Sequence, residues 1–342
     1  MSLFDTITKS KRTFIIAEAG VNHDGNIELA RKLVDIAVGA GVDAVKFQAF
    51  RTEHLILDNI EKAPYQVKNT GGQQTQAEML RALELKNEQY AELKAYCQSK
   101  KILFLITPFD EHSLQELEEL GVDAYKVAST DTTNLPFLKK IAQTGKPVIL
   151  STGMCYMDEV RAAVQTVLEV NKQLILLQCT ANYPITDDEA NLNVMHTFKK
   201  EFNCPVGYSD HTVGLGASLY AVAMGACVVE KHFTIDKTAP GPDHRASLDA
   251  EELKTFVMEI RKIEMYLGGY EKQPTKAEMG TRASLQKCLV ATCSIKKGEV
   301  ISEHMIVAKR TGGKGISPLH YKKLTGSKAL RDYEKNDIIE ME

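Results

Sequence analysis

Short apolar runs rich in β-branched residues alternate with amphipathic helical patterns from residue 14 to about residue 267. The runs predict strands at 14–19, 44–48, 102–106, 124–128, 148–151, 174–178, 205–208 and 227–232. Between them, apolar residues recur at helical spacing, for example at 27–40, 76–99, 158–170 and 250–267. Eight strand–helix units over roughly 255 residues are the number and length typical of a (β/α)8 barrel, so we predict this α/β fold, the TIM barrel.

A doubly wound sheet is the alternative fold for alternating strands and helices. It would carry a phosphate-binding GxGxxG sequence after its first strand. Here the first predicted strand is followed by EAGVNHDG at 18–25, which does not match. The barrel is therefore the prediction for residues 1–267.

The pattern changes after Leu267. The sequence GGYEKQP at 268–274 is typical of a break between domains. Residues 284–342 contain short strand patterns, a KKGE turn and a glycine-rich loop. We predict a linker at 268–283 and a small second domain at 284–342, which packs on something larger because roughly 60 residues bury little core.

Charge and apolar patterning exclude several classes of protein. The net charge is only −3, from 42 basic and 45 acidic residues without a basic cluster, so we do not expect a nucleic-acid partner. No run approaches the roughly 18 apolar residues of a membrane span, and the N-terminal segment has no apolar signal sequence. The seven cysteines are dispersed without a CxxC pair, as in reduced proteins. We expect a cytoplasmic protein.

Two histidines follow the last two predicted strands of the barrel. His211 lies in GYSDHT and His232 in EKHFT, each just after an apolar run. Because the carboxyl ends of barrel strands share one rim, the two imidazoles are expected to lie close together. Two neutral imidazoles could hold a divalent cation, although they fill only part of its coordination sphere. Two hydrogen-bonded structural histidines are the alternative.

Polar side chains also cluster at the carboxyl ends of the other predicted strands. They are Glu18, Lys46, Gln48, Thr107, Lys126, Ser129, Asp131, Ser151 and Tyr183. A single lysine at a strand end is usually solvated or paired with a carboxylate. Polar residues at eight successive strand ends instead predict a convergent site on the carboxyl-terminal face of the barrel.

Lysines and hydroxyl groups at this rim suit an anion of high charge density, because lysine binds phosphate as a point charge. A Schiff base on Lys46 or Lys126, as in an aldolase, is the alternative. The residues leave both chemistries open. The HExxH helix of zinc peptidases and the GxSxG turn of serine hydrolases are absent from the sequence.

Longer motifs occur along nearly the whole chain. They are IIAEAGVNHDG at 15–25, AVKFQ at 44–48, KAPYQ at 62–66, TPFD at 107–110, YKVAS at 125–129, NLP at 134–136, STGM at 151–154, CTANYP at 179–184, GYSDHT at 207–212, EKHFTIDK at 230–237 and GPDH at 241–244. With these motifs the chain resembles the nonulosonic acid synthase family, which includes the N-acetylneuraminate (sialic acid) synthases. The tail, with SIKKGEVIS at 294–302 and AKR at 308–310, is similar to the antifreeze-like (SAF) domain of that family.

The resemblance implies a transferase that condenses phosphoenolpyruvate with an N-acetylated amino sugar and water, and releases phosphate. It implies a divalent metal, Mn2+ or Mg2+, on His211 and His232, which would polarise the sugar aldehyde. It also implies proton transfer by Glu18. Phosphoenolpyruvate would be held by Lys46, Lys126, Ser129, Ser151 and Thr107. Gln48, Tyr183 and Asp243 would line the same pocket, and Asp131 would contact the sugar hydroxyls. Arg310 would reach the sugar from the partner subunit, which implies a domain-swapped homodimer.

The identity of the sugar is the open question within this family. The leading interpretation is N-acetylmannosamine, which gives N-acetylneuraminate. The alternative is 2,4-diacetamido-2,4,6-trideoxymannose, which gives N,N'-diacetyllegionaminate. Outside the family, a Schiff-base lyase of the neuraminate type would use pyruvate without a metal. A non-catalytic ice- or sugar-binding protein is suggested by the tail alone, and the polar strand ends argue against it.

Overall fold

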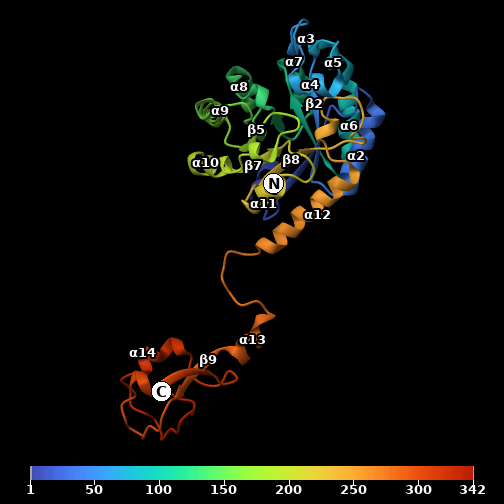
Figure 1. Ribbon diagram of the computed structural model, residues 1–342. Helices are drawn as coiled ribbons and strands as arrows, with labels where there is room; N and C mark the ends of the chain where they lie inside the picture. The colour runs from blue at the N-terminus through green and yellow to red at the C-terminus, as the bar shows by residue number, and fades with distance from the viewer. Residues whose placement is uncertain (1, 342) are drawn as a thin grey trace. The chain divides into compact units, whose positions relative to one another are not determined.

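Eight parallel strands close into a barrel in the computed structural model, which describes residues 2–341 (Figure 1). In chain order they are β1 Phe14–Gly20, β2 Ala44–Ala49, β3 Leu103–Pro108, β4 Tyr125–Val127, β5 Val148–Ser151, β6 Leu174–Cys179, β7 Val206–Asp210 and β8 Val228–His232. Each strand pairs with the next one along the chain, and β8 pairs with β1. The predicted TIM barrel is confirmed, and the doubly wound sheet is excluded.

Helices surround the barrel on its outside (Figure 1). Those that follow the strands include α2 Ile27–Ala40, α6 Asn87–Lys100, α7 Glu111–Leu120, α8 Leu135–Gln143, α9 Met157–Val170, α10 Val194–Glu201, α11 Ser218–Ala223 and α12 Ala250–Leu267. Within the described residues, no helix has both the length and the hydropathy to cross a bilayer.

The segment between β2 and β3 differs from the prediction of one helix at 76–99. It contains α3 Thr52–Leu55, α4 Pro64–Thr70 and α5 Gln76–Leu83, and α6 begins only at Asn87. The long helix is interrupted because Glu84 and Leu85 contact other parts of the fold. The Glu84 carboxylate accepts a hydrogen bond from the Thr52 amide at 2.7 Å, and the Leu85 carbonyl accepts one from Arg51 at 2.8 Å.

Alternate strand residues face the barrel interior, as the period of two in a β-strand requires. In the lower part of the barrel these residues are apolar, namely Phe14, Ile16, Ala44, Leu105, Ala124, Ile149, Ile175, Leu177 and Val228. The N-terminal arm expected from the sequence is a helix, α1 Leu3–Thr8, whose first turn is capped by the Ser2 hydroxyl. Its Ile7 packs against this interior core, so the amino-terminal end of the barrel is closed. Polar chemistry is thereby confined to the opposite rim.

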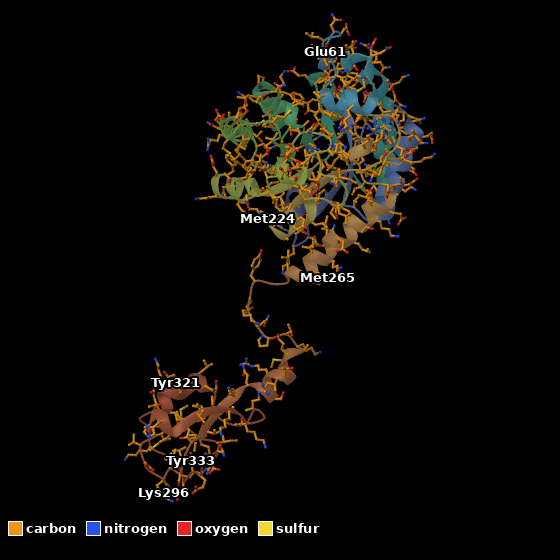
Figure 2. The ribbon with its side chains drawn as sticks, viewed as in Figure 1. Glu61, Met224, Met265, Lys296, Tyr321 and Tyr333 are labelled. Atoms are coloured by element: carbon orange, nitrogen blue, oxygen red, sulfur yellow. The ribbon has the colours of Figure 1, made fainter. Side chains whose placement is uncertain are left out.

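The chain divides into two compact units, the first ending at Gly268 and the second beginning at Gly269. In the second unit, β9 Lys287–Ala291 and β10 Ile306–Arg310 form an antiparallel pair. The hydrophobic core of the second unit includes Leu289, Ile295 and the fully buried Tyr333, which is labelled in Figure 2. Helix α13 Glu278–Leu285 begins inside the segment expected to be a linker, and α14 Tyr321–Leu324 follows β10.

Candidate active site

A cavity of about 570 Å³ lies at the carboxyl-terminal rim of the barrel. All the predicted site residues of the first unit line it: Glu18, Lys46, Gln48, Thr107, Lys126, Ser129, Asp131, Ser151, Tyr183, His211, His232 and Asp243. They converge because they occupy inward-facing strand positions or the loops directly after them. Arg310 lies at the end of β10 in the second unit and is exposed.

Two lysines and two glutamates form the charged floor of this cavity. The Lys46 ammonium lies 2.7 Å from Glu18 Oε2 and 3.9 Å from Glu230 Oε1, and the Lys126 ammonium lies 3.5 Å from Glu230 Oε1. All four side chains are buried. Glu230 was not among the predicted site residues. Glu230 lies two residues before His232 on the same strand, and strand alternation therefore places both side chains on the inner face. This spacing is the sequence signal that could have identified Glu230 as a site residue.

The two carboxylates have pKa values that are shifted in opposite directions. Burial raises the pKa of Glu18, and the negative charge of Glu230 raises it further against the opposing effect of Lys46. Burial would also raise the pKa of Glu230, but the charges of Lys126 and Lys46 outweigh it and lower this pKa. Glu230 is therefore the permanent counter-ion of the lysines, whereas Glu18 is suited to gain and lose a proton.

Hydroxyl groups extend the lysine pair into a site for an anion. Lys46 donates to Thr107 Oγ1 at 3.1 Å, and Lys126 donates to Ser151 Oγ at 2.7 Å. Ser129 Oγ accepts a hydrogen bond from the Gly153 amide at 2.9 Å. A Cβ at Gly153 would lie 2.9 Å from that same Ser129 oxygen, so only glycine permits this approach. Such a cluster of ammonium and hydroxyl donors matches a phosphate or carboxylate group.

The two histidines are neighbours, with ring centroids 5.4 Å apart. His211 Nδ1 lies 2.7 Å from the Thr180 carbonyl, which can only accept, so Nδ1 carries a proton and, in the neutral ring, Nε2 keeps its lone pair. His232 Nδ1 is buried and has no hydrogen-bond partner. Burial holds the pKa of His232 well below its usual value, and the positive charges of Lys46, Lys231 and Lys126 lower it further, so this imidazole is neutral.

These two imidazoles fit a divalent cation that takes its remaining ligands from substrate or water. A neutral imidazole with a free lone pair is a common metal ligand, and an unpartnered buried nitrogen is otherwise costly. Among the described residues, no group of three or more His, Cys, Asp and Glu side chains is arranged to hold a metal ion by itself. Asp243 Oδ2 lies 3.9 Å from His232 Nδ1, which is too far for a hydrogen bond, and Asp243 lines the same cavity.

A buried network outside the barrel fixes the strand ends that carry the histidines. Asp210 Oδ2 lies 3.1 Å from the Lys231 ammonium and accepts hydrogen bonds from the amide and hydroxyl of Ser218. Asp210 Oδ1 accepts from the amide and hydroxyl of Thr212. Asp210 and Lys231 each directly precede one of the histidines, so this ion pair links β7 to β8 at the level of the site.

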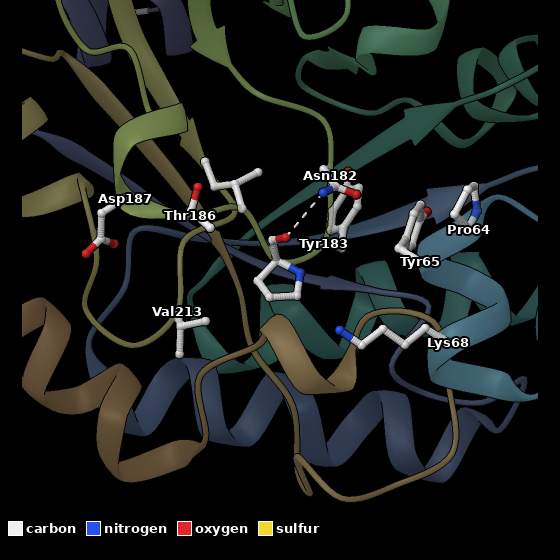
Figure 3. Close-up of a pocket in the computed structure, with 10 residues that line it drawn as sticks. Pro64, Tyr65, Lys68, Asn182, Tyr183, Thr186, Asp187 and Val213 are labelled. Atoms are coloured by element: carbon white, nitrogen blue, oxygen red, sulfur yellow. Dashed lines mark hydrogen bonds between the residues drawn. The ribbon is translucent and has the colours of Figure 1, made fainter.

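A second pocket of about 690 Å³ adjoins the main cavity. Tyr65 and Tyr183 line both, with their rings 5.0 Å apart, and Lys68 and Val213 line the outer pocket (Figure 3). Tyr183 also lies against the two histidines, with its centroid 4.1 Å from that of His211 and 5.4 Å from that of His232. The two tyrosines thus form the side that the main cavity shares with the outer pocket.

Comparisons with known proteins identify the family of each unit of the chain. Residues 33–272 match the NeuB family, and residues 286–342 match the SAF domain. The N,N'-diacetyllegionaminic acid synthase of Campylobacter jejuni subsp. jejuni serotype O:2 is 44% identical over 96% of this chain and 99% of its own length. The human N-acetylneuraminate-9-phosphate synthase is 38% identical over 95% of this chain and 91% of its own length.

The fold is also shared with a solved relative. A crystal structure of an N-acetylneuraminic acid (sialic acid) synthetase from Leptospira borgpetersenii serovar Hardjo-bovis superposes with a TM-score of 0.72. It is 36% identical, and the match covers 80% of this chain and 92% of that one.

Proposed function

The chain belongs to the NeuB family, and on that premise we propose that it is a transferase that makes N,N'-diacetyllegionaminate from phosphoenolpyruvate, water and 2,4-diacetamido-2,4,6-trideoxymannose. The observation that carries this choice of sugar is the identity of 44% to a legionaminic acid synthase over nearly the whole of both chains, against 38% to the human enzyme. It replaces N-acetylmannosamine, the leading interpretation of the sequence. Neither relative is named as a lyase, so the Schiff-base alternative gains no support.

The reaction joins C3 of phosphoenolpyruvate to the aldehyde carbon of the open-chain sugar. The aldehyde oxygen takes a proton and becomes a hydroxyl group, water adds at C2 of phosphoenolpyruvate, and phosphate leaves as its C–O bond breaks. The ammonium groups of Lys46 and Lys126 and the hydroxyls beside them would hold the phosphate and carboxylate. Glu18, with its raised pKa, would exchange the proton at the aldehyde oxygen.

His211 and His232 would hold a divalent cation, Mn2+ or Mg2+, which when bound polarises the aldehyde as a Lewis acid. The Tyr183 ring packs against both imidazoles and would help to keep them in position. Glu230 would help to hold Lys46 and Lys126 in place, because its carboxylate lies within 3.9 Å of both ammonium groups.

The proposal is tested by phosphate release from phosphoenolpyruvate in the presence of Mn2+ and either sugar. We expect kcat/KM for the diacetamido trideoxy sugar to exceed that for N-acetylmannosamine by about 10- to 100-fold, the discrimination that small differences in apolar groups usually give. Equal or faster turnover of N-acetylmannosamine would contradict the choice of sugar while leaving the reaction class intact.

The Arg310→Ala variant is expected to raise the KM for the sugar by about 10-fold or more and that for phosphoenolpyruvate much less. The reason is that an exposed guanidinium on the second unit would reach the acetamido group from the partner subunit of a domain-swapped homodimer, and one charge-assisted hydrogen bond contributes roughly 1.5–3 kcal/mol. Mixing Arg310→Ala with Glu18→Ala should then restore activity in a verified heterodimer. No recovery there would exclude a shared site.

A further inference from the structure

One side of the active-site cavity is apolar, in contrast to its charged floor. It is lined by Leu55 of α3, Met79, Leu80 and Leu83 of α5, and Phe109 after β3. This set is called the apolar wall below. It comes mainly from the segment between β2 and β3 (Figure 1).

The apolar wall is a packed surface rather than a set of loose side chains. Its residues form one cluster with the buried Val21 and Phe50, and the Phe50 and Phe109 rings meet edge to face with centroids 6.3 Å apart. Met79 and Leu83 are buried, whereas Leu55, Leu80 and Phe109 are partly exposed. The partly exposed members therefore present carbon atoms to the cavity, and the buried members hold them there.

One polar acceptor at the edge of the wall already has partners. Gln66 Oε1 accepts hydrogen bonds from the Ala63 amide at 2.9 Å and from Gln76 Nε2 at 3.0 Å. A substrate hydroxyl placed against Leu80 would thus lose its water without gaining a partner from the wall, which is unfavourable. A methyl group in the same place would gain contact with carbon.

We propose that the apolar wall receives the methyl groups at the far end of the sugar, at its deoxygenated carbon and its distal acetamido group, and so selects deoxy sugars over hydroxylated ones. This inference rests on the proposed function. The lysines and histidines would bind the reacting end, and the apolar wall lines the same cavity. A hydroxyl-bearing sugar is disfavoured, not excluded, because apolar pockets reject an added hydroxyl only about 100-fold at most.

The test is the Leu80→Gln variant, with kcat/KM measured for both sugars by phosphate release. We expect the ratio of the deoxy sugar to N-acetylmannosamine to fall by about 10-fold, because an amide now faces the cavity. The kcat/KM values for the two sugars are measured on the same protein preparation. A fraction of inactive, partly folded protein lowers both values equally and therefore does not change their ratio. The control is Leu57→Gln, since Leu57 lies in the same segment, is 77% exposed and does not line the cavity.

The outcomes separate the two proposals. An unchanged ratio in both Leu80→Gln and a second variant, Leu55→Gln, overturns the inference, as does an equal fall in Leu57→Gln. If the unmodified protein releases phosphate with neither sugar, the proposed function is wrong and the inference falls with it. A lower ratio in Leu80→Gln and Leu55→Gln alone supports the wall as the determinant of specificity.

Discussion

The His232→Ala variant is expected to release phosphate about 10²–10³ times more slowly than the unmodified protein, because Lewis-acid stabilisation amounts to several kcal/mol and each 1.36 kcal/mol is tenfold in rate. The physical reason is the neutral His232 imidazole beside His211, each ring with a nitrogen free to bind a cation. Titration with Mn2+ alone should also show a weaker affinity in the variant, and this measurement does not depend on turnover.

His196→Ala is the matched control, since His196 is exposed on α10 and does not line the cavity. It should retain both activity and Mn2+ affinity. If His232→Ala bound Mn2+ as tightly as His196→Ala does, His232 would not be a metal ligand, whatever its effect on turnover.

The Lys126→Met variant is expected to lower kcat/KM for phosphoenolpyruvate by about 10²–10³, mainly through a higher KM. Removing one member of a buried, hydrogen-bonded charge pair costs roughly 2–5 kcal/mol, and 1.36 kcal/mol is tenfold. Lys126 donates to Ser151 and lies 3.5 Å from Glu230, so its loss removes one of the two cations at the anion site and leaves Glu230 with only the more distant Lys46, 3.9 Å away. Initial rates over a range of phosphoenolpyruvate concentrations provide the measurement.

Lys231→Met separates this effect from the general cost of losing a buried lysine. Lys231 is equally buried and paired with Asp210, but it lies outside the cavity. We expect Lys231→Met to unfold at lower denaturant concentration while keeping its KM for phosphoenolpyruvate. A similar rise in KM in both variants would show that Lys126 acts through the fold rather than through the substrate.

The break in the helix predicted at 76–99 shows where a local pattern is insufficient. Its apolar residues recur at helical spacing on both sides of Leu85, so the sequence favours one helix. The contacts of Glu84 with Thr52 and of Leu85 with Arg51 join residues more than 30 positions apart, and they separate α5 from α6. That separation allows α5 to contribute to the apolar wall while α6 covers the barrel.

Within the site, Glu230 also illustrates the difference between what a local sequence pattern predicts and what the tertiary structure decides. The sequence places it on the inner face of β8 by the alternation that also places His232 there. Its importance arises from its distance to Lys46 on β2 and Lys126 on β4, two strands far from β8 in the chain. A sequence pattern does not encode which side chains from different strands reach one another across a barrel.

The sequence by itself determined the barrel, its polar rim and the inward-facing residues that line the cavity. It could do so because strand alternation and the shared direction of parallel strands are properties of the local chain. Only the tertiary structure decided which carboxylate neutralises the lysines, which histidine nitrogens remain free, and which side of the cavity is apolar. Those features depend on distances between side chains from strands and helices that are remote in the chain, and such distances are fixed only when the barrel closes.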